Sequence, residues 1–216
     1  MNRPLIGISG SHNIADRQMF VRENYMQSVL RAGGIPVLLP EIEDEETAKA
    51  ILDRLDGLLL AGGGDVLPSR YGEETLPACG EDDPQRDIFE LLIIPMAIAR
   101  NMPIFGICLG HQLLALANGF KTEKLKYGHR GTNQPVQNLE TGRVYISSQN
   151  HGYAVVSSTI DPEIADEYFN NVNDRTCEGV RYKKIPAFSV QFHPEACGGP
   201  HDTAFLFDKF FEMMGK

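Results

Sequence analysis

At residues 103–112 the sequence reads Pro-Ile-Phe-Gly-Ile-Cys-Leu-Gly-His-Gln. The first five residues are typical of a buried strand, and residues 113–117 continue directly with the spacing of an apolar helix face. Only a very sharp turn can join a strand to a helix with no loop between them. Gly106 and Gly110 flank Cys108 in a G-x-C-x-G pattern, which lets backbones approach closely around such a turn. The segment therefore predicts a strand–turn–helix elbow with Cys108 at its tip.

Cys108 is the first candidate functional residue. A side chain at the tip of an elbow protrudes from the end of the sheet and lies at a helix N-terminus, where free N–H groups and the helix dipole stabilise a thiolate. For a cysteine taken alone, a buried position at a strand end is the competing interpretation. Because two glycines flank this cysteine and the pattern switches from strand to helix at it, we predict that Cys108 is a nucleophile.

Composition limits the possible partners and compartments. The chain has 216 residues, enough for one domain spanning residues 1–216, and a net charge of −9 with no basic stripe. This charge argues against nucleic-acid and anionic-membrane partners, and no apolar stretch is long enough to span a bilayer. Residues 1–4 lead directly into a strand-like run, which leaves no room for a signal peptide.

Four cysteines lie far apart without metal-ligand spacing: Cys79, Cys108, Cys177 and Cys197. We expect reduced thiols in a cytoplasmic protein, with no metal and no cofactor.

The order of the predicted elements indicates the fold class. In the first half, strands are expected at residues 5–9, 35–39 and 57–61. Helices are expected at residues 22–32, beginning at residue 44, and at residues 83–99, the last with a kink at Pro95. Regular alternation predicts an α/β fold, a doubly wound, mostly parallel sheet with helices on both faces. From about residue 120 to 191 we expect short, partly antiparallel strands, with turns at 141–142, 150–152 and 173–174. A final helix is expected at 201–214, and no linker divides the chain.

His193 is the candidate base among six histidines. It follows the strand-like residues 187–192, so it should emerge at the same edge of the sheet as Cys108. Pro194 stops the strand, and Glu195 can fold back to fix the imidazole tautomer and raise its basicity. His111 lies in the elbow helix and is expected to pack or hydrogen-bond. The other four histidines are His12, His129, His151 and His201. The last three sit in turn-rich segments and could line the site, but they are not favoured as the base.

Acyl chemistry also requires donors for a developing oxyanion. The backbone N–H of Leu109, the residue after the nucleophile, is one candidate. The glycine-rich segment 61–66 is the other, with Gly63 and Gly64 as the expected donors. This segment matches neither G-x-G-x-x-G nor a Walker loop, which disfavours phosphate binding, and a plain turn is the remaining alternative.

The elbow at residues 105–112 and the segment Gln-Phe-His-Pro-Glu at 191–195 resemble the class I glutamine amidotransferase-like family. The resemblance implies a flavodoxin-like doubly wound fold with a small antiparallel extension. It also implies a Cys-His-Glu triad, with Cys108 as the nucleophile, His193 as the base and Glu195 as the orienting carboxylate.

Different parts of the chain resemble two different branches of this family. Residues 31–40, 62–68, 71–73 and 86–87 are similar to the γ-glutamyl-γ-aminobutyrate hydrolases. Residues 127–131, 148–155 and 199–203 are similar to the glutaminase domain of the carbamoyl-phosphate synthetase small subunit. In that second branch, the α-amino and α-carboxylate groups of glutamine are held by the positions that match Leu109, Gln112, Asn150, Gly152 and Tyr153. The substrate-binding candidates are Gln112, Asn150, His151, Gly152 and Tyr153.

The chain departs from this synthetase branch in two respects. Members of the branch have a further N-terminal docking domain, whereas this sequence begins at the amidotransferase sheet. They also have Asn-Gly-Pro-Gly where this chain has Gly-Gly-Gly-Asp at residues 62–65.

We therefore expect first a free-standing, cysteine-dependent hydrolase of γ-glutamyl amides, which forms a glutamyl thioester on Cys108 and releases glutamate and an amine or ammonia. The alternative is a glutaminase subunit that feeds ammonia to a synthetase partner. A third possibility is a binding module with an idle triad. The expected partners are a small γ-glutamyl substrate and either a second copy of the chain or the synthetase.

Overall fold

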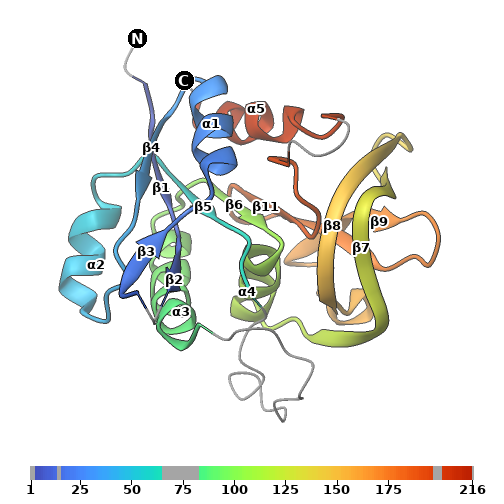
Figure 1. The fold of residues 1–216 in the computed structure, drawn as a ribbon, viewed down its shortest axis with the longest axis horizontal. Coiled ribbons are helices and arrows are strands. Elements are labelled where there is room, and N and C mark those ends of the chain that lie inside the picture. Colours follow the sequence, from blue (N-terminus) through green and yellow to red (C-terminus); the bar gives the residue numbers. More distant parts are fainter. Residues whose placement is uncertain (1–2, 14–15, 65–82, 197–200, 216) are drawn as a thin grey trace.

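The computed structural model describes residues 3–13, 16–64, 83–196 and 201–215, and its central element is one sheet (Figure 1). Within these ranges nine strands form the sheet, in the order β4 (Ile35–Leu38), β1 (Leu5–Ile8), β5 (Gly57–Leu60), β6 (Ile104–Ile107), β11 (Ala187–Val190), β10 (Cys177–Tyr182), β9 (Ala165–Asn171), β7 (Thr122–Asn138) and β8 (Val144–Val155). A separate hairpin consists of β2 (Ser11–Asn13) and β3 (Gln18–Phe20). The helices are α1 (Glu23–Arg31), α2 (Glu45–Leu52), α3 (Pro84–Ala99), α4 (Leu109–Ala117) and α5 (Phe205–Glu212), with a 3₁₀ turn at Ser157–Thr159.

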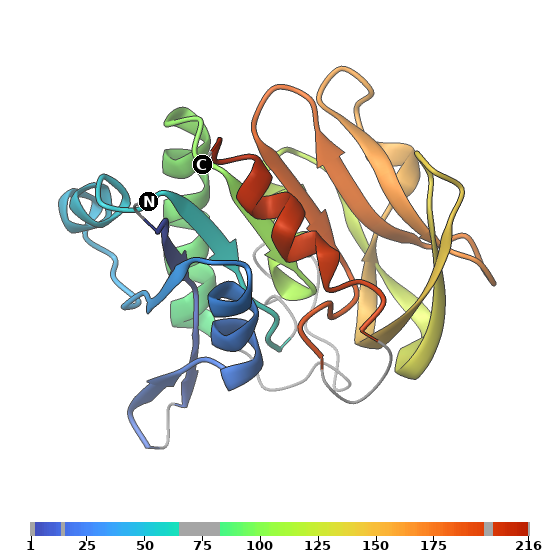
Figure 2. The same cartoon turned by 90° about the horizontal axis from the view of Figure 1, so that it is seen from above.

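The first five strands of this order are parallel and carry helices on both faces. Alternate residues of each strand point to opposite faces: Leu58 and Leu60 pack with α2, α3 and α4, while Leu59 packs with α1 and α5. Figures 1 and 2 show α1 and α5 together on one side of the sheet. A strand buried on both faces needs an unbroken apolar run, which explains why β5 reads Gly-Leu-Leu-Leu. The predicted doubly wound α/β class is confirmed.

The antiparallel half differs from the sequence-based expectation. We predicted short strands here, but β7 has 17 residues and β8 has 12. The predicted turn at residues 150–152 is wrong, because these residues lie inside β8, where Asn150 pairs with Arg130 and His151 with His129. Opposite them, β7 carries irregular register at Gly128 and Gly131, both of which have positive φ. The backbone irregularity therefore lies in β7, where β-bulges take up the extra residues, and residues 150–152 of β8 do not reverse the chain.

Helix α3 begins as predicted. Asp83 is its N-cap, with the side chain accepting a hydrogen bond from the Arg86 N–H at 3.2 Å, and Pro84 occupies the first turn. Helix α5 is shorter than expected, since it begins at Phe205 rather than near residue 201. No helix in the described ranges is both long and apolar enough to cross a bilayer. Residues 65–82 and 197–200, which include Cys79, Cys197 and parts of the resembling motifs, lie outside the described residues.

Candidate active site

The elbow is present where the sequence predicts it. Cys108 connects β6 to α4 with φ 53° and ψ −101°, a conformation that residues with a side chain rarely adopt. Its N–H donates to the Val190 carbonyl at 2.8 Å, and its carbonyl accepts from the His111 N–H at 3.1 Å. These bonds to β11 and to the first turn of α4 fix the strained residue on both sides.

The two flanking glycines are required by close packing. A Cβ on Gly106 would lie 2.6 Å from the Gly110 carbonyl oxygen, and a Cβ on Gly110 would lie 2.5 Å from Leu60 Cβ. Both distances are far below van der Waals contact, so helix α4 could not begin this close to β5 and β6 with side chains at these positions. The G-x-C-x-G pattern is thus a packing requirement of the elbow.

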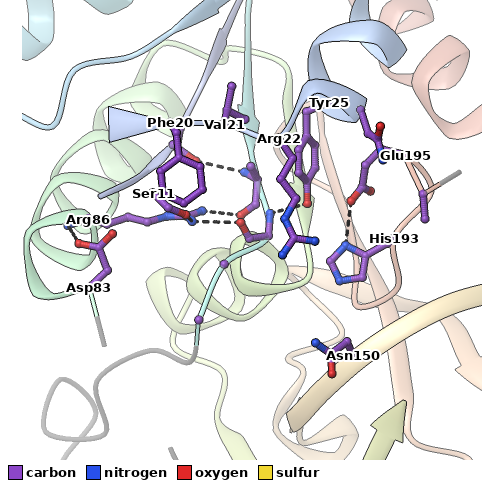
Figure 3. Close-up of a pocket in the computed structure, with 18 of the residues that line it drawn as sticks. Ser11, Phe20, Val21, Arg22, Tyr25, Asp83, Arg86, Asn150, His193 and Glu195 are labelled. Carbon is purple, nitrogen blue, oxygen red and sulfur yellow. Dashed lines mark hydrogen bonds and ion pairs between the residues drawn. The ribbon is translucent and has the colours of Figure 1, made fainter. Parts of the chain in front are cut away.

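The structure brings the predicted base and orienting carboxylate to Cys108. His193 lies three residues after the end of β11, and its N–H donates to the Ser148 carbonyl at 2.9 Å. Its Nδ1 lies 2.8 Å from Glu195 Oε1 (Figure 3). Burial by itself lowers the pKa of His193, but the adjacent Cys108 thiolate and the Glu195 carboxylate together raise this pKa well above its usual value. The raised pKa favours the imidazolium form of His193, whose Nδ1 faces the Glu195 carboxylate.

Tyr25 is a site residue that the sequence did not reveal. It is buried in α1, and its hydroxyl accepts a hydrogen bond from the Gly62 N–H at 2.9 Å. Burial, then the nearby Glu195 and Cys108 charges, raise the pKa of Tyr25 well above its usual value, so the phenol stays protonated. In the sequence Tyr25 has only the spacing of an apolar helix face. No local pattern distinguishes it from a core residue.

The glycine loop after β5 passes directly over the nucleophile. A Cβ on Gly62 would lie 2.9 Å from His193 Cε1 and 3.4 Å from Cys108 Cβ. Gly63 and Gly64 follow at the exposed surface, lining the same cavity as His193. Leu109, the other predicted oxyanion donor, is the first residue of α4. A Cβ on Gly63 would lie 2.9 Å from Leu109 Cδ2, so the glycine loop and the start of α4 lie next to each other beside Cys108.

The predicted substrate contacts divide into one cavity residue and several buried ones. Asn150 is exposed and lines the cavity (Figure 3). Gln112 is buried, and its amide donates to Gln191 Oε1 at 3.2 Å and to the Tyr153 carbonyl at 3.3 Å. Tyr153 is buried, and Gly152 is half-buried. Residue Gln191 also donates to Cys108 Sγ at 3.6 Å, which links the buried amides to the nucleophile.

His151, the next residue of β8, is buried. Its Nδ1 lies 2.8 Å from the Tyr153 carbonyl and its Nε2 lies 3.1 Å from Gln149 Oε1. Burial lowers the pKa of His151 to about 4, so the ring is neutral near pH 7. The ring therefore positions neighbouring groups of β8 instead of supplying a charge.

The cavity has a volume of about 1360 Å³ and two walls. One wall comes from the β2–β3 hairpin and the start of α1, and includes Ser11, Phe20 and Arg22. The other comes from β7 and β8, with His193 and Glu195 between the walls. Cys108 itself is only 4% exposed. The Cys108 side chain is therefore almost completely covered by its neighbours, whereas His193 and Glu195 line the cavity.

Two groups of described residues could each offer three metal ligands within 4.8 Å of one another. They are His129, His151 and Glu178, and His12, Glu41 and Asp83. In the first group His129 is already engaged by two carboxylates, with Nδ1 3.0 Å from Glu178 and Nε2 2.8 Å from Asp174. Hydrogen bonding to Glu178 raises the pKa of His129 to about 9 against the opposing effect of burial. The described contacts are those of an ion-pair network.

This network predicts a pH-dependent contribution to stability. The pKa of His129 is raised above its unfolded value of ~6.5, so its stabilisation is complete below that pH and is lost as pH rises through about 9. We expect His129→Asn to lower the free energy of unfolding by roughly 1–3 kcal/mol at pH 6 and by much less at pH 9.5. Urea denaturation of both proteins at the two pH values measures this difference. An equal difference at both pH values would contradict the assignment.

The chain matches known proteins along most of its length. The model of the Peptidase C26 family matches residues 4–195. Among curated relatives, the carbamoyl phosphate synthase small chain of Syntrophotalea carbinolica is 43% identical over 91% of this chain and 46% of its own length. The small chain of Fusobacterium nucleatum is 54% identical over 62% of this chain and 37% of its own length. The arginine-specific small chain of Debaryomyces hansenii is 43% identical over 88% of this chain and 40% of its own length. The chain thus spans less than half the length of these relatives.

Solved structures share the fold. A putative GMP synthase component from Thermoplasma acidophilum superposes with a TM-score of 0.73 at 18% identity, covering 100% of this chain and 96% of that chain. A glutamine amidotransferase from Thermotoga maritima superposes with a TM-score of 0.63 at 20% identity, covering 91% of this chain and 78% of that chain. At sequence identities this low, the similarity to the two solved structures shows a shared fold.

Proposed function

Because the chain belongs to the Peptidase C26 family, we propose that it is a glutaminase, which hydrolyses the side-chain amide of glutamine and releases ammonia for a synthetase partner. The observation that carries this proposal is that His193 contacts both Cys108 and Glu195, and that His193 and Glu195 line the cavity. The relatives named carbamoyl phosphate synthase small chain support a synthetase chain as the partner. The resemblance of residues 127–131 and 148–155 to the glutaminase domain of that subunit supports glutamine as the substrate. Together they favour this function over the γ-glutamyl amine hydrolase expected first from the sequence.

The geometry supports a two-step acyl transfer. The Cys108 thiolate attacks the side-chain carbonyl carbon of glutamine, and the N–H groups of Leu109 and of the loop at Gly63 and Gly64 stabilise the oxyanion. His193 then gives its proton to the departing nitrogen, which leaves as ammonia while a glutamyl thioester remains on Cys108. In the second step neutral His193 takes a proton from water, whose oxygen attacks the thioester and releases glutamate. Glu195 holds the ring in one tautomer throughout.

Hydrolysis of γ-glutamyl amines is the second candidate function, and one observation favours it. The cavity, at about 1360 Å³, is larger than the ~300–1,000 Å³ typical of small-molecule sites, and its outer wall carries Arg22, His12 and Phe20 from the first part of the chain. A leaving amine larger than ammonia would lie against this wall. The same thioester chemistry would serve both substrates.

The decisive measurement compares glutamine with a set of γ-glutamyl amines, including γ-glutamyl-aminobutyrate, at equal concentration. We expect glutamate release from glutamine with a kcat/KM at least about tenfold above that of any amine in the set, with ammonia formed in equal amount. Adding the large synthetase chain should raise the glutaminase rate. A tenfold preference for a γ-glutamyl amine would establish the second candidate, and no glutamate from any substrate would exclude both.

A further inference from the structure

We propose that Arg86 is a positioning residue that holds the glycine loop at residues 61–64 so that its N–H groups face the substrate carbonyl. The inference rests on the proposed amide hydrolysis, because it concerns the oxyanion donors of that reaction. Arg86 lies in the first turn of α3, far from Cys108 in the sequence, and its side chain is only 1% exposed.

The Arg86 guanidinium donates hydrogen bonds to two successive carbonyl groups of the loop. Its Nη2 donates to the Ala61 carbonyl at 2.5 Å, and its Nη1 donates to the Gly62 carbonyl at 3.0 Å (Figure 3). Nη1 also donates to Ser11 Oγ at 2.9 Å, which ties the loop to the start of the β2 strand. One planar side chain thus fixes two peptide units of a loop in which Gly62, Gly63 and Gly64 have no side chains to anchor them.

Fixing a carbonyl also fixes the N–H of the next residue. The described chain has no cis peptide bonds, and in a trans peptide the C=O and the following N–H point in opposite directions. The Ala61 carbonyl points to Arg86, and the Gly62 N–H correspondingly points away from it to the Tyr25 hydroxyl at 2.9 Å. By the same geometry, the Gly62 carbonyl held by Arg86 turns the Gly63 N–H away from α3. This N–H is one of the predicted oxyanion donors.

Burial of the arginine is made possible by Glu90, one helical turn later. Glu90 is fully buried, and its Oε1 accepts from Arg86 Nη2 at 3.0 Å. Lysine could keep this ion pair, but a single ammonium nitrogen cannot match the planar fork that reaches both carbonyls and Ser11. Position 86 therefore requires the planar shape of the arginine guanidinium as well as its positive charge.

The glycine loop needs a side chain from elsewhere to restrict its backbone. Consecutive glycines have the largest backbone freedom of any residues, so donors on an unrestrained loop would spend much of their time misaligned. A Cβ on Gly63 would collide with the Arg86 guanidinium, which shows how closely the two pack. Loss of one aligned oxyanion donor typically lowers kcat by ~10²–10³-fold.

Arg86→Lys tests the role while keeping the charge beside Glu90. We expect kcat for glutamine to fall by about 10–10³-fold with KM changed by less than about threefold, because the donors act in the transition state. The rate at which iodoacetamide alkylates Cys108, followed by peptide mass spectrometry, should stay within about twofold of wild type, since the thiolate–imidazolium pair is untouched. In Arg86→Ala, added guanidinium should restore part of the lost kcat.

Arg100→Lys is the matched control. Arg100 caps the other end of α3 and pairs with Asp53 at 2.9 Å, away from the loop. We expect its kcat to be unchanged. Thermal melting of all variants establishes that the folded protein is being compared.

The outcomes separate the two proposals. Wild-type hydrolysis of glutamine with an equally active Arg86→Lys variant would overturn the role of Arg86 and leave the glutaminase proposal standing. A parallel loss of kcat and alkylation rate would also overturn it, because it would show general damage to the site. If wild type releases no glutamate, the glutaminase proposal fails, and Cys108-dependent hydrolysis of p-nitrophenyl acetate replaces it as the readout. Equal ester rates in wild type and Arg86→Lys would then overturn the positioning role, and a tenfold or greater loss would support it.

Discussion

Replacing Cys108 with alanine is expected to reduce glutamate release from glutamine to background, a loss of roughly 10⁴–10⁶-fold in kcat. In the proposed reaction the thiol supplies the atom that forms the acyl intermediate, and the Cys108 side chain is a hydrogen-bond partner of His193. Glutamate is measured with a coupled dehydrogenase assay, over a time long enough to detect one turnover per hour.

Cys177→Ala is the matched control for this variant. Cys177 is also a free, buried cysteine, but it lies in β10, where its Sγ contacts the Gly179 carbonyl at 3.6 Å. Burial and the nearby carboxylate Glu167 raise the pKa of Cys177 far above that of an ordinary thiol, so it stays protonated. Its replacement should leave kcat within about twofold. More than 1% residual activity in Cys108→Ala would contradict the nucleophile assignment.

Replacing His193 with asparagine is expected to lower kcat by about 10³–10⁴-fold. This imidazole stabilises the Cys108 thiolate and supplies the proton for the leaving nitrogen, so both steps of the proposed reaction lose their proton carrier. The variant should also react more slowly with iodoacetamide at pH 7. Because the raised pKa of His193 keeps the wild-type ring protonated at this pH, the wild-type thiolate has a cationic partner that the variant lacks.

The pH dependence of alkylation makes this prediction specific. The difference in rate between wild type and His193→Asn should shrink as pH rises past ~8.5, where an ordinary thiol ionises without help. His201→Asn, at an exposed position before α5, serves as the control and should match wild type at every pH. Equal alkylation rates for His193→Asn and wild type at pH 7 would show that the two side chains do not interact.

The parts of the site that could be predicted are those that local sequence determines. The elbow follows from two glycines around one cysteine, since the turn itself excludes side chains at those positions. His193 and Glu195 could be placed because a strand followed by proline leaves few alternatives for where they emerge. The elbow and the placement of His193 and Glu195 could each be predicted from a few consecutive residues.

Arg86 and Tyr25 could not be assigned, because tertiary packing gives them their roles. In the sequence Arg86 and Glu90 have the spacing of an ordinary surface ion pair on a helix, yet both are buried against the glycine loop. Tyr25 has the spacing of a core residue. The long β7–β8 pair was missed for a different reason, since the bulges near Gly128 and Gly131 interrupt the alternation from which strands are recognised.

The backbone at Cys108 has a consequence for how this sequence can change over time. A side chain held at φ 53° and ψ −101° costs about 1–3 kcal/mol relative to a relaxed backbone, whereas glycine could occupy the same angles with little strain. Selection for thermal robustness alone would therefore drive position 108 toward glycine and erase the chemistry. In the proposed reaction glycine would remove the nucleophile, so the strain at this position is a cost in stability that the thiol chemistry requires.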